Sequence, residues 1–456
     1  MTNFLGCPEM DTQIYEEACA VRKTIEETGM KYFIATCLFA LFLGGSEATL
    51  AQMPQLRIPD GVGVHAGLEA GNDHELDMIA AAGIKVLRVD MPWETVESLD
   101  GNYNWSDYDK LIQKMANRGL RAMVIFDGSH PRYEPKVAWT GSKNLGTDDD
   151  GHLFTRAAPR HPKSVAAFAK WAAATVQHFS GRQIIWEIQN EPNNEFWSPK
   201  PDVREYTTLA LATVHAIRAI DPHATIVGAS ASMAESGEMD WEFLSGFMSS
   251  GILKWLDGIT VHPYRVGNRP PETVGAEYAK LRQLIDRYAP PGKKGRIAII
   301  SGEWGYSSGF ENSSLPRTDD NALSVSATQQ ADYLVRQQLF DLISGVPFSI
   351  WFQWMNADKD PHKAFREMGL VTSALVPKPS YLALQNMTRE LNGFRPERRL
   401  ESTPQNRDDF IFIFVGPNGM KKIVAWTSSA LHKVFCGEIQ KELSLTGSPV
   451  YIPYSR

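Results

Sequence analysis

From residue 61 onward the chain alternates between short runs of β-branched and other apolar residues and longer stretches with a helical period. Residues 73–83 illustrate the helical kind, because Leu76, Ile79, Ala80 and Gly83 fall at i, i+3, i+4 and i+7. Eight strand–helix pairs follow one another in this way. The expected strands are residues 61–65, 85–90, 120–127, 183–189, 225–229, 258–264, 296–301 and 347–355.

Strands that are regularly separated by helices pair in parallel through right-handed crossovers. An open doubly wound sheet and a closed barrel both satisfy this rule. The count of eight favours the barrel, and the GVGVHAG segment at residues 61–67 lacks the glycine fingerprint of a nucleotide-binding open sheet. We therefore expect an α/β fold, a (β/α)8 TIM barrel over residues 52–395. Its long insertions follow the third and eighth strands, on the face where barrel active sites lie.

Beyond residue 395 the pattern changes to short alternating strands separated by polar turns. The strand-like segments are residues 408–416, 421–428, 433–438 and 448–453. A few strands cannot bury both of their faces alone. The sequence therefore predicts a small β accessory domain at residues 396–456 that packs on the barrel.

The N-terminal region resembles a targeting segment. Lys31 precedes a 12-residue apolar run at 32–43, and the small residues Thr49 and Ala51 are placed for cleavage before Gln52. A helix that spans a bilayer needs about 20 apolar residues, so a stable membrane anchor is not expected. We predict an upstream extension at 1–29, a signal peptide at 30–51, and export to the periplasm or the extracellular space.

Charge and composition limit the kinds of ligand that the protein is expected to bind. The formal net charge is −7, and no lysine or arginine cluster suggests binding to nucleic acid or to an anionic membrane. Removal of residues 1–51 would leave Cys436 as the lone cysteine, which is expected to be a buried small side chain rather than a reactive thiol. Twelve tryptophans offer flat faces on which sugar rings stack, so a carbohydrate is a fitting ligand.

Two glutamates stand four residues apart in WEIQNEPN, at residues 186–193. In an extended strand this spacing separates them by about 13 Å, so only Glu191 reaches the rim of the barrel. Pro192 lacks an amide donor and suits the point where the strand pairing ends. Glu187 is expected to be a buried, paired structural carboxylate. Glu303, in IAIISGEWG, closes the seventh strand in the same manner as Glu191 closes the fourth.

Two carboxyl groups that face each other at a barrel mouth are suited to hydrolysis of a glycosidic bond. One must be protonated and the other ionised, which requires unequal surroundings. Arg88 is expected either to hold the nucleophile ionised or to form a structural ion pair. His262 and Tyr264, at the end of the sixth strand, are expected to orient Glu303, although a buried structural histidine is an open alternative.

The remaining candidates concern binding. Four tryptophans near strand ends are expected to form a sugar-stacking floor, with one or two of them belonging to the core: Trp93, Trp304, Trp351 and Trp354. No metal or cofactor is expected. The acidic segments 147–152 and 356–362 lack full calcium-loop spacing and are expected to be solvated loops. No strand ends in the lysine or phosphate-gripping loop of an aldolase-like or cofactor-dependent barrel.

The segments WEIQNEPN, VHPY and GEWGYS, in this order, resemble the (β/α)8 retaining glycoside hydrolases of the clan that includes families 5 and 39. The similarity is strongest to family 39-like bacterial glycosidases and covers residues 61–395. The resemblance implies that Glu191 is the acid/base, that Asn190 binds the sugar 2-hydroxyl group, and that Glu303 is the nucleophile of a double displacement. Gln189 departs from the aromatic residue of many relatives, and His130 follows no clear family pattern.

Two function classes stay open at this point. The first is a retaining hydrolase that acts on an oligosaccharide or polysaccharide. The second is a non-hydrolytic carbohydrate-binding barrel that kept the cleft and lost turnover. The presence of both glutamates favours the hydrolase.

Overall fold

The computed structural model describes residues 53–67, 71–138, 154–234, 236–266, 269–308, 324–357 and 367–454. The predicted extension and signal peptide lie outside these ranges, as do the acidic segment 147–152 and most of the segment 356–362. No helix within the described ranges is long and apolar enough to cross a membrane.

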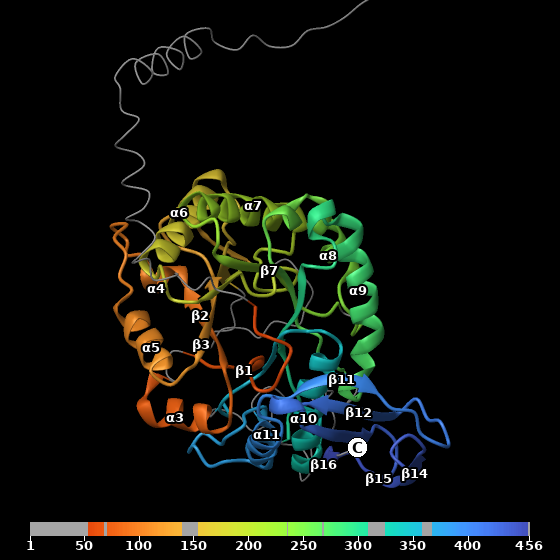
Figure 1. Ribbon diagram of the computed structural model, residues 1–456. Coiled ribbons are helices and arrows are strands. Elements are labelled where there is room, and N and C mark those ends of the chain that lie inside the picture. Colours follow the sequence, from red (N-terminus) through yellow and green to blue (C-terminus); the bar gives the residue numbers. More distant parts are fainter. Residues whose placement is uncertain are drawn as a thin grey trace, which may run out of the picture. The chain divides into compact units, whose positions relative to one another are not determined.

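Eight parallel strands close into a barrel, so the predicted fold class is confirmed (Figure 1). Around the barrel the neighbours run in the order β1, β10, β9, β8, β7, β6, β3 and β2. The strands are β1 (Val62–His65), β2 (Val86–Pro92), β3 (Arg121–Asp127), β6 (Ile185–Ile188), β7 (Thr225–Ala231), β8 (Gly258–Val261), β9 (Ala298–Trp304) and β10 (Ser349–Trp351).

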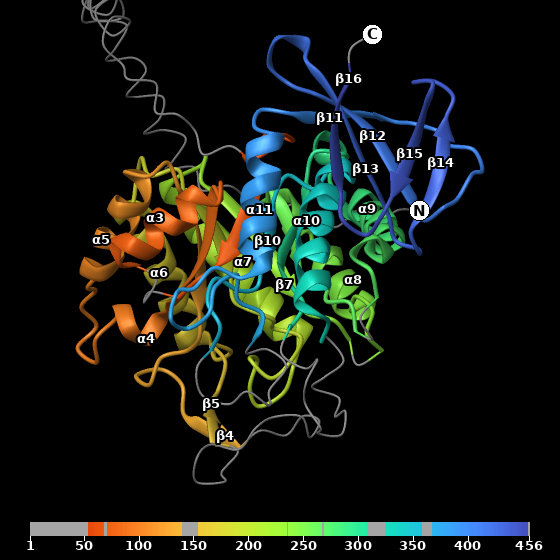
Figure 2. The same ribbon diagram turned by 90° about the horizontal axis from the view of Figure 1, so that it is seen from below.

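Helices surround the strands, as Figures 1 and 2 show. They are α3 (Asp73–Ala81), α4 (Trp93–Val96), α5 (Ser106–Ala116), α6 (Pro162–His178), α7 (Val203–Ile220), α8 (Trp241–Ser249), α9 (Gly275–Tyr288), α10 (Ala327–Ile343) and α11 (Pro379–Glu390). Short 3-10 helices are η2 (Ile252–Lys254), η3 (Pro271–Val274), η4 (Pro291–Lys293) and η7 (Pro417–Gly419). The hairpin of β4 (Lys136–Ala138) and β5 (Phe154–Arg156) belongs to the insertion after β3.

The two ends of the barrel interior differ in chemistry. An apolar layer fills the end where the strands begin, and Met53 packs against it. Its members are Val86, Met123, Ile185, Val227, Ile300, Phe348 and Ile350. A Cβ on Gly258 would stand 2.4 Å from the Ile300 side chain, so a glycine is needed for this layer to close. Glu303 and His262 stand at the opposite end, where β9 and β8 finish.

The C-terminal strands form an antiparallel appendage, as predicted. Its sheet has the order β11 (Arg395–Arg399), β12 (Asp409–Val415), β13 (Lys421–Thr427) and β16 (Val450–Tyr454), and β14 (His432–Cys436) pairs with β15 (Lys441–Leu445). Figure 2 shows these strands together, next to α10. Cys436 is fully buried in an apolar cluster with residues such as Ile413 and Leu443, as expected for a small apolar side chain.

The appendage is joined to the barrel by packed rings and by one buried charge cluster. Phe410 stacks on Trp426 at 5.2 Å between ring centroids, and Phe410 also meets Phe340 of α10 edge to face. The Trp426 indole N–H donates to Glu272 of η3 at 2.7 Å. Arg336 of α10 binds both oxygens of the same carboxylate at 2.7 and 2.6 Å.

Candidate active site

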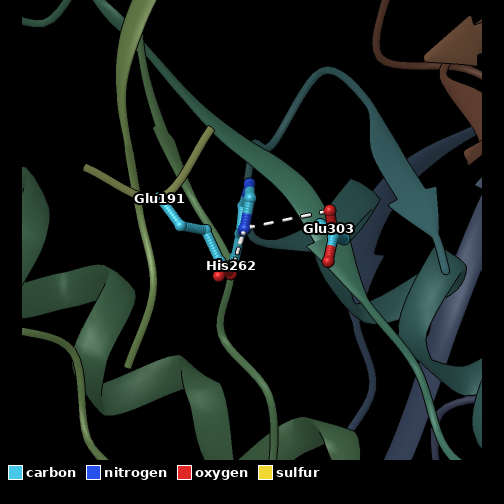
Figure 3. A group of neighbouring side chains, drawn as sticks. All are labelled: Glu191, His262 and Glu303. Atoms are coloured by element: carbon cyan, nitrogen blue, oxygen red, sulfur yellow. Dashed lines mark hydrogen bonds and ion pairs between the residues drawn. The ribbon is translucent and has the colours of Figure 1, made fainter. Parts of the chain in front are cut away.

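The predicted catalytic pair lies where the strands end. Glu303 is the penultimate residue of β9, and Glu191 lies three residues beyond β6. Figure 3 shows both glutamates beside His262, which follows β8 directly. One oxygen of each carboxyl group and a ring nitrogen of His262 all lie within 4.8 Å of one another. Glu191 and Glu303 are only 7% and 8% exposed, so they share one small buried mouth.

The backbone that carries Glu191 leaves the strand conformation in an uncommon way. Gln189 and Glu191 have positive φ values of 60° and 43°, and on the neighbouring strand Ala229 and Ser230 have 78° and 44°. Side chains other than glycine rarely adopt this left-handed region, and such strain gathers at functional sites. The Glu191 N–H donates to the Ser230 carbonyl at 3.1 Å, which ties the two irregular segments together. This turn sets the carboxyl group of Glu191 over the barrel mouth.

Arg88 of β2 organises the site from within the barrel. Its Nε–H donates to Glu187 at 2.8 Å, Nη1 donates to Glu303 at 2.7 Å, and Nη2 donates to Asn190 at 2.8 Å. Both alternatives for this arginine therefore hold at once: it forms a structural pair with Glu187 and also binds the predicted nucleophile. Burial disfavours its charge, but the carboxylates of Glu187 and Glu303 raise the pKa of Arg88, which stays a cation.

Glu303 receives a separate donor on each oxygen. Arg88 binds Oε2, and the Tyr264 hydroxyl group donates to Oε1 at 2.8 Å. Burial raises the pKa of Tyr264 well above its ordinary value, and the charges of Glu303 and Glu191 add to this effect. The phenol therefore remains a donor. A guanidinium and a hydroxyl donor together match the needs of an ionised carboxylate.

Glu191 has different surroundings. Its Oε2 accepts from the Asn194 amide at 2.5 Å, and its Oε1 lies 2.7 Å from His262 Nδ1. Burial raises the pKa of Glu191. Arg88 is not bonded to it among the described contacts. The two carboxyl groups thus differ in their partners: a cation binds Glu303, whereas the donors to Glu191 are neutral and burial raises the pKa of Glu191, as suits an acid/base.

His262 corrects one expectation. It was predicted to orient Glu303, but its Nδ1 is 4.0 Å from Glu303 Oε2 and only 2.7 Å from Glu191 Oε1. The reason is the irregular turn after β6, which brings Glu191 over the end of β8. Burial lowers the pKa of His262 to about 4, so the ring is neutral near neutral pH. Ser230 and Arg88 lie at Nε2, at 3.2 and 3.4 Å, which leaves the ring proton on Nδ1 facing Glu191.

The tryptophan floor is the second correction. All four indoles are at most 1% exposed and offer no free face: Trp93, Trp304, Trp351 and Trp354. Three of their N–H groups are bound within the core, to Glu97, to the Met368 carbonyl and to Glu75. Large rings gain most from complete burial, and periodicity alone does not separate a core tryptophan from one at the rim. The partly exposed ring at the end of β10 is Phe352, which lies 5.2 Å from the His65 ring.

His130 has a structural place rather than a catalytic one. It is 1% exposed, and its Nε2 lies 2.9 Å from the Glu97 carbonyl. Its Nδ1 accepts the backbone N–H of Arg132 at 3.1 Å. Both nitrogens are therefore used to fix the loop after β3, away from the catalytic pair.

Three polar residues at or near strand ends, His65, Asp90 and Asp127, were not among the predicted site residues. His65 closes β1, with Nδ1 3.2 Å from Arg88 Nη1 and Nε2 3.3 Å from an oxygen of Asp90 in β2. Asp127 closes β3, and burial together with the charge of Asp90 raises the pKa of Asp127 to about 6. Each of these residues follows an apolar run, which is the same signal that indicated Glu303. The same signal therefore also indicates rim residues on β1, β2 and β3.

Glu191, His262 and Glu303 also have the ligand types and proximity of a cation site. The guanidinium of Arg88, however, lies 2.7 Å from Glu303 and 3.4 Å from His262. A divalent cation held by these three groups would face that positive charge at short range. The arrangement therefore favours proton transfer and nucleophilic attack over metal binding.

Together, the barrel and its facing carboxyl groups define a class, the glycoside hydrolases. One oxygen of each carboxyl group lies within 4.8 Å of the other, which agrees with the carboxyl separation of about 5–5.5 Å in retaining enzymes rather than with the about 6.5–9.5 Å of inverting ones. The sequence model of the family described as cellulase (glycosyl hydrolase family 5) matches residues 60–338, which is more than half of the chain. The chain belongs to glycosyl hydrolase family 5.

Solved structures of glycosidases share the fold. A family 39 glycoside hydrolase from the gut symbiont Bacteroides cellulosilyticus is 18% identical with a TM-score of 0.68, over 88% of this chain and 81% of that one. A family 39 β-xylosidase from Caulobacter crescentus is 20% identical with a TM-score of 0.55, over 85% and 81%. At such identities the likeness shows the fold alone. No curated protein matches the chain significantly in sequence. The predicted clan and the glycosidase activity are confirmed, and a carbohydrate substrate follows.

Proposed function

We propose that Glu303 is the nucleophile and Glu191 the acid/base of a retaining double displacement on an oligosaccharide or polysaccharide. One observation carries this assignment, the unequal partners of the two carboxyl groups. Glu303 is bound by the Arg88 cation and the Tyr264 hydroxyl group, whereas Glu191 is hydrogen-bonded to the neutral side chains of Asn194 and His262, and burial raises its pKa. An ionised nucleophile and a protonated acid are what the first step requires.

In the first step an oxygen of Glu303 forms a bond to the anomeric carbon as the bond to the leaving oxygen breaks. Glu191 gives its proton to that oxygen, and a glycosyl ester on Glu303 remains. In the second step the Glu191 carboxylate takes a proton from water. The water oxygen attacks the anomeric carbon and displaces Glu303. Two inversions at one carbon restore the original configuration.

The neighbouring groups have roles that follow from their contacts. Asn190 is held by Arg88 at 2.8 Å and is proposed to bind the sugar 2-hydroxyl group next to the reacting carbon. Ester formation neutralises Glu303 and removes a negative charge close to Glu191. This lowers the pKa of Glu191 at the stage when it must act as a base. Tyr264 and Arg88 then stabilise the departing Glu303 carboxylate in the second step.

The place of action is also part of the proposal. The apolar run at 32–43 with small residues before Gln52 supports a cleaved signal peptide and export to the periplasm or the extracellular space. The near absence of basic clusters supports a carbohydrate, rather than nucleic acid, as the partner. N-terminal sequencing of the protein secreted by an expressing bacterium is expected to begin near Gln52. An intact N-terminus on cytoplasmic protein would contradict export.

The catalytic roles are tested with azide and dinitrophenyl glycosides, whose leaving group needs no acid. Glu303→Ala is expected to lose about 10⁴-fold or more in kcat, and azide then yields a glycosyl azide of inverted configuration. Glu191→Ala with azide is expected to yield the azide of retained configuration, because azide attacks the glycosyl ester. Glu195→Gln, a nearby matched glutamate, is expected to keep wild-type products. Interchanged configurations would reverse the two roles, and binding without turnover by wild type would favour the non-hydrolytic barrel.

A further inference from the structure

A second acidic group of residues lies beside the catalytic pair, at the ends of three adjacent strands. His65, Asp90 and Asp127 come from β1, β2 and β3, which are neighbours in the barrel. The side chain of Asp90 is 38% exposed and that of His65 is 12% exposed, so this group opens toward solvent. The Asp127 carboxyl group accepts the N–H of Asn190, the residue before Glu191. The three side chains thus border the same mouth as Glu191.

This border also carries an aromatic ring. Phe352 follows β10, the other neighbour of β1, and is partly exposed. Its ring lies 5.2 Å from that of His65 at 45°. A partly exposed ring next to carboxylates is the usual combination for a sugar, because the ring stacks on C–H groups while oxygens accept from hydroxyl groups.

The hydrogen-bond donors of Arg88, the cation in this mouth, are all used by groups of the protein. A guanidinium has five N–H donors. Those of Arg88 are directed at Glu187, Glu303, His65 and Asn190, with Ser230 and His262 at 3.4 Å. Within the described part of the chain, Arg88 is the only lysine or arginine bonded to the catalytic pair or to this second group. Arg88 therefore has no donor left for an anionic group of a substrate.

The balance of charge in the mouth is negative. The side chains of Glu303 and Asp90 are 11% and 38% exposed and Asp127 is partly buried, while the single guanidinium is shared between Glu303 and the buried Glu187. Even when His65 carries a proton, its charge is taken up by Asp90 at 3.3 Å. A sugar carboxylate or sulfate placed here would lose its hydration beside like charges, which costs free energy without a compensating partner. Neutral hydroxyl groups instead find strong acceptors.

We propose that His65, Asp90, Asp127 and Phe352 form a sugar-binding subsite for rings that bear no anionic group, and that Asp90 and Asp127 exclude uronic acids and sulfated sugars. The proposal rests on the glycosidase function above and assigns its substrate class. The enzyme accordingly acts on a neutral glycan at this subsite. The C6 hydroxyl group and a neighbouring ring hydroxyl group donate to the two carboxylates, and Phe352 covers one face of the ring.

The test compares aryl glycosides that share a leaving group and stereochemistry and differ only at C6, such as a glucoside with a glucuronide and a galactoside with a galacturonide. For whichever pair wild type cleaves, kcat/KM for the neutral sugar is expected to exceed that for the uronide about 100-fold or more. Equal turnover, or a preference for the uronide, would overturn the proposal while leaving the glycosidase function intact.

Two variants test whether Asp90 and Asp127 cause the preference for the neutral sugar over the uronide. Asp90→Asn and Asp127→Asn are each expected to raise KM for the neutral sugar more than they lower kcat. Each is also expected to reduce the ratio of kcat/KM for the neutral sugar to kcat/KM for the uronide about tenfold. Asp100→Asn, at an exposed aspartate outside this group, is the matched control and is expected to keep wild-type discrimination. Unchanged discrimination in both active-site variants would remove Asp90 and Asp127 from the role.

A binding arm separates this proposal from failure of the catalytic assignment. Glu303→Gln is titrated calorimetrically with neutral cello-, xylo- and manno-oligosaccharides and with oligogalacturonate. Tighter binding of a neutral oligosaccharide supports the subsite even when no aryl glycoside is cleaved, an outcome that would overturn the catalytic roles alone. Tighter binding of oligogalacturonate, or no binding of either class, would overturn the subsite.

Discussion

Two buried arginine–glutamate clusters in this molecule use the same chemistry for different ends. Under the β-appendage, Arg336 binds both oxygens of Glu272, and the Trp426 indole donates to the same carboxylate. Both charged side chains are only 4% exposed. This cluster is closed, because two hydrogen bonds join the same two side chains and both side chains are buried. It joins η3, α10 and β13 and leaves nothing for a ligand.

The Arg88 cluster is open by contrast. Its donors are spread over groups on different strands rather than fixed on one carboxylate, and the Glu303 side chain keeps 11% exposure toward the mouth. A bidentate pair fixes two structural elements to each other. An arginine that binds several groups fixes the positions of these groups relative to one another. Arg88 and Arg336 are both buried, so burial does not distinguish these two clusters, whereas the number of groups that each arginine binds does.

Loss of Arg88 is expected to have the largest effect. Arg88→Met leaves Glu187 buried without a counter-charge and Glu303 without its cation. Removal of one partner of a buried ion pair costs about 3–5 kcal/mol of unfolding free energy. We expect this loss in urea denaturation and a fall in kcat/KM of about 10⁴-fold, because the nucleophile loses the cation that holds its Oε2 in place.

A double variant sharpens the result. Arg88→Met with Glu187→Leu removes the orphaned buried carboxylate and is expected to recover most of the unfolding free energy. Activity is expected to stay low, because Glu303 still lacks its cation. Recovery of activity together with stability would show that Arg88 serves only to neutralise Glu187.

The prediction of intermediate size concerns Arg336 and Glu272, the ion pair under the β-appendage. Arg336→Met is expected to cost a similar 3–5 kcal/mol of unfolding free energy, since Glu272 loses a buried bidentate partner. For the folded protein, kcat/KM is expected to stay within about twofold of wild type, because neither residue contacts the catalytic mouth. Urea titration and steady-state kinetics below the transition measure both quantities. A tenfold loss of kcat/KM in folded protein would mean that the appendage takes part in catalysis.

Much of this architecture follows from local signals. Apolar runs of strand length between helical periods predicted the barrel, and a polar residue that closes such a run predicted Glu191 and Glu303. These signals are short in sequence range and depend on one strand at a time. They were also present at His65, Asp90 and Asp127. These rim residues could therefore also be predicted from the sequence.

The side-chain contacts between strands could not be predicted from the sequence. His262 approaches Glu191 rather than Glu303 because residues 189 and 191 turn in the left-handed region, which no pattern of residue types announces. The burial of Trp351 and Trp354 depends likewise on what covers them, including the Met368 carbonyl and Glu75 from distant segments. Sequence indicated which residues stand at the rim, whereas the side chain that each one meets is set by tertiary structure.

The smallest effect concerns the proton on Glu191. Burial raises the pKa of Glu191, while the hydrogen bond from Asn194 lowers it by favouring the ionised form. Glu191 must be protonated in the first step, so kcat/KM is lost as the pH rises through this pKa. Asn194→Ala removes the opposing hydrogen bond and is expected to move the alkaline limb of the pH profile upward by about 0.5–1 unit. Asn117→Ala, at an exposed asparagine on the far side of α5, is the control and is expected to leave the limb in place. A downward shift in Asn194→Ala would mean that Asn194 stabilises the protonated form, and an unchanged profile would assign the alkaline limb to another group.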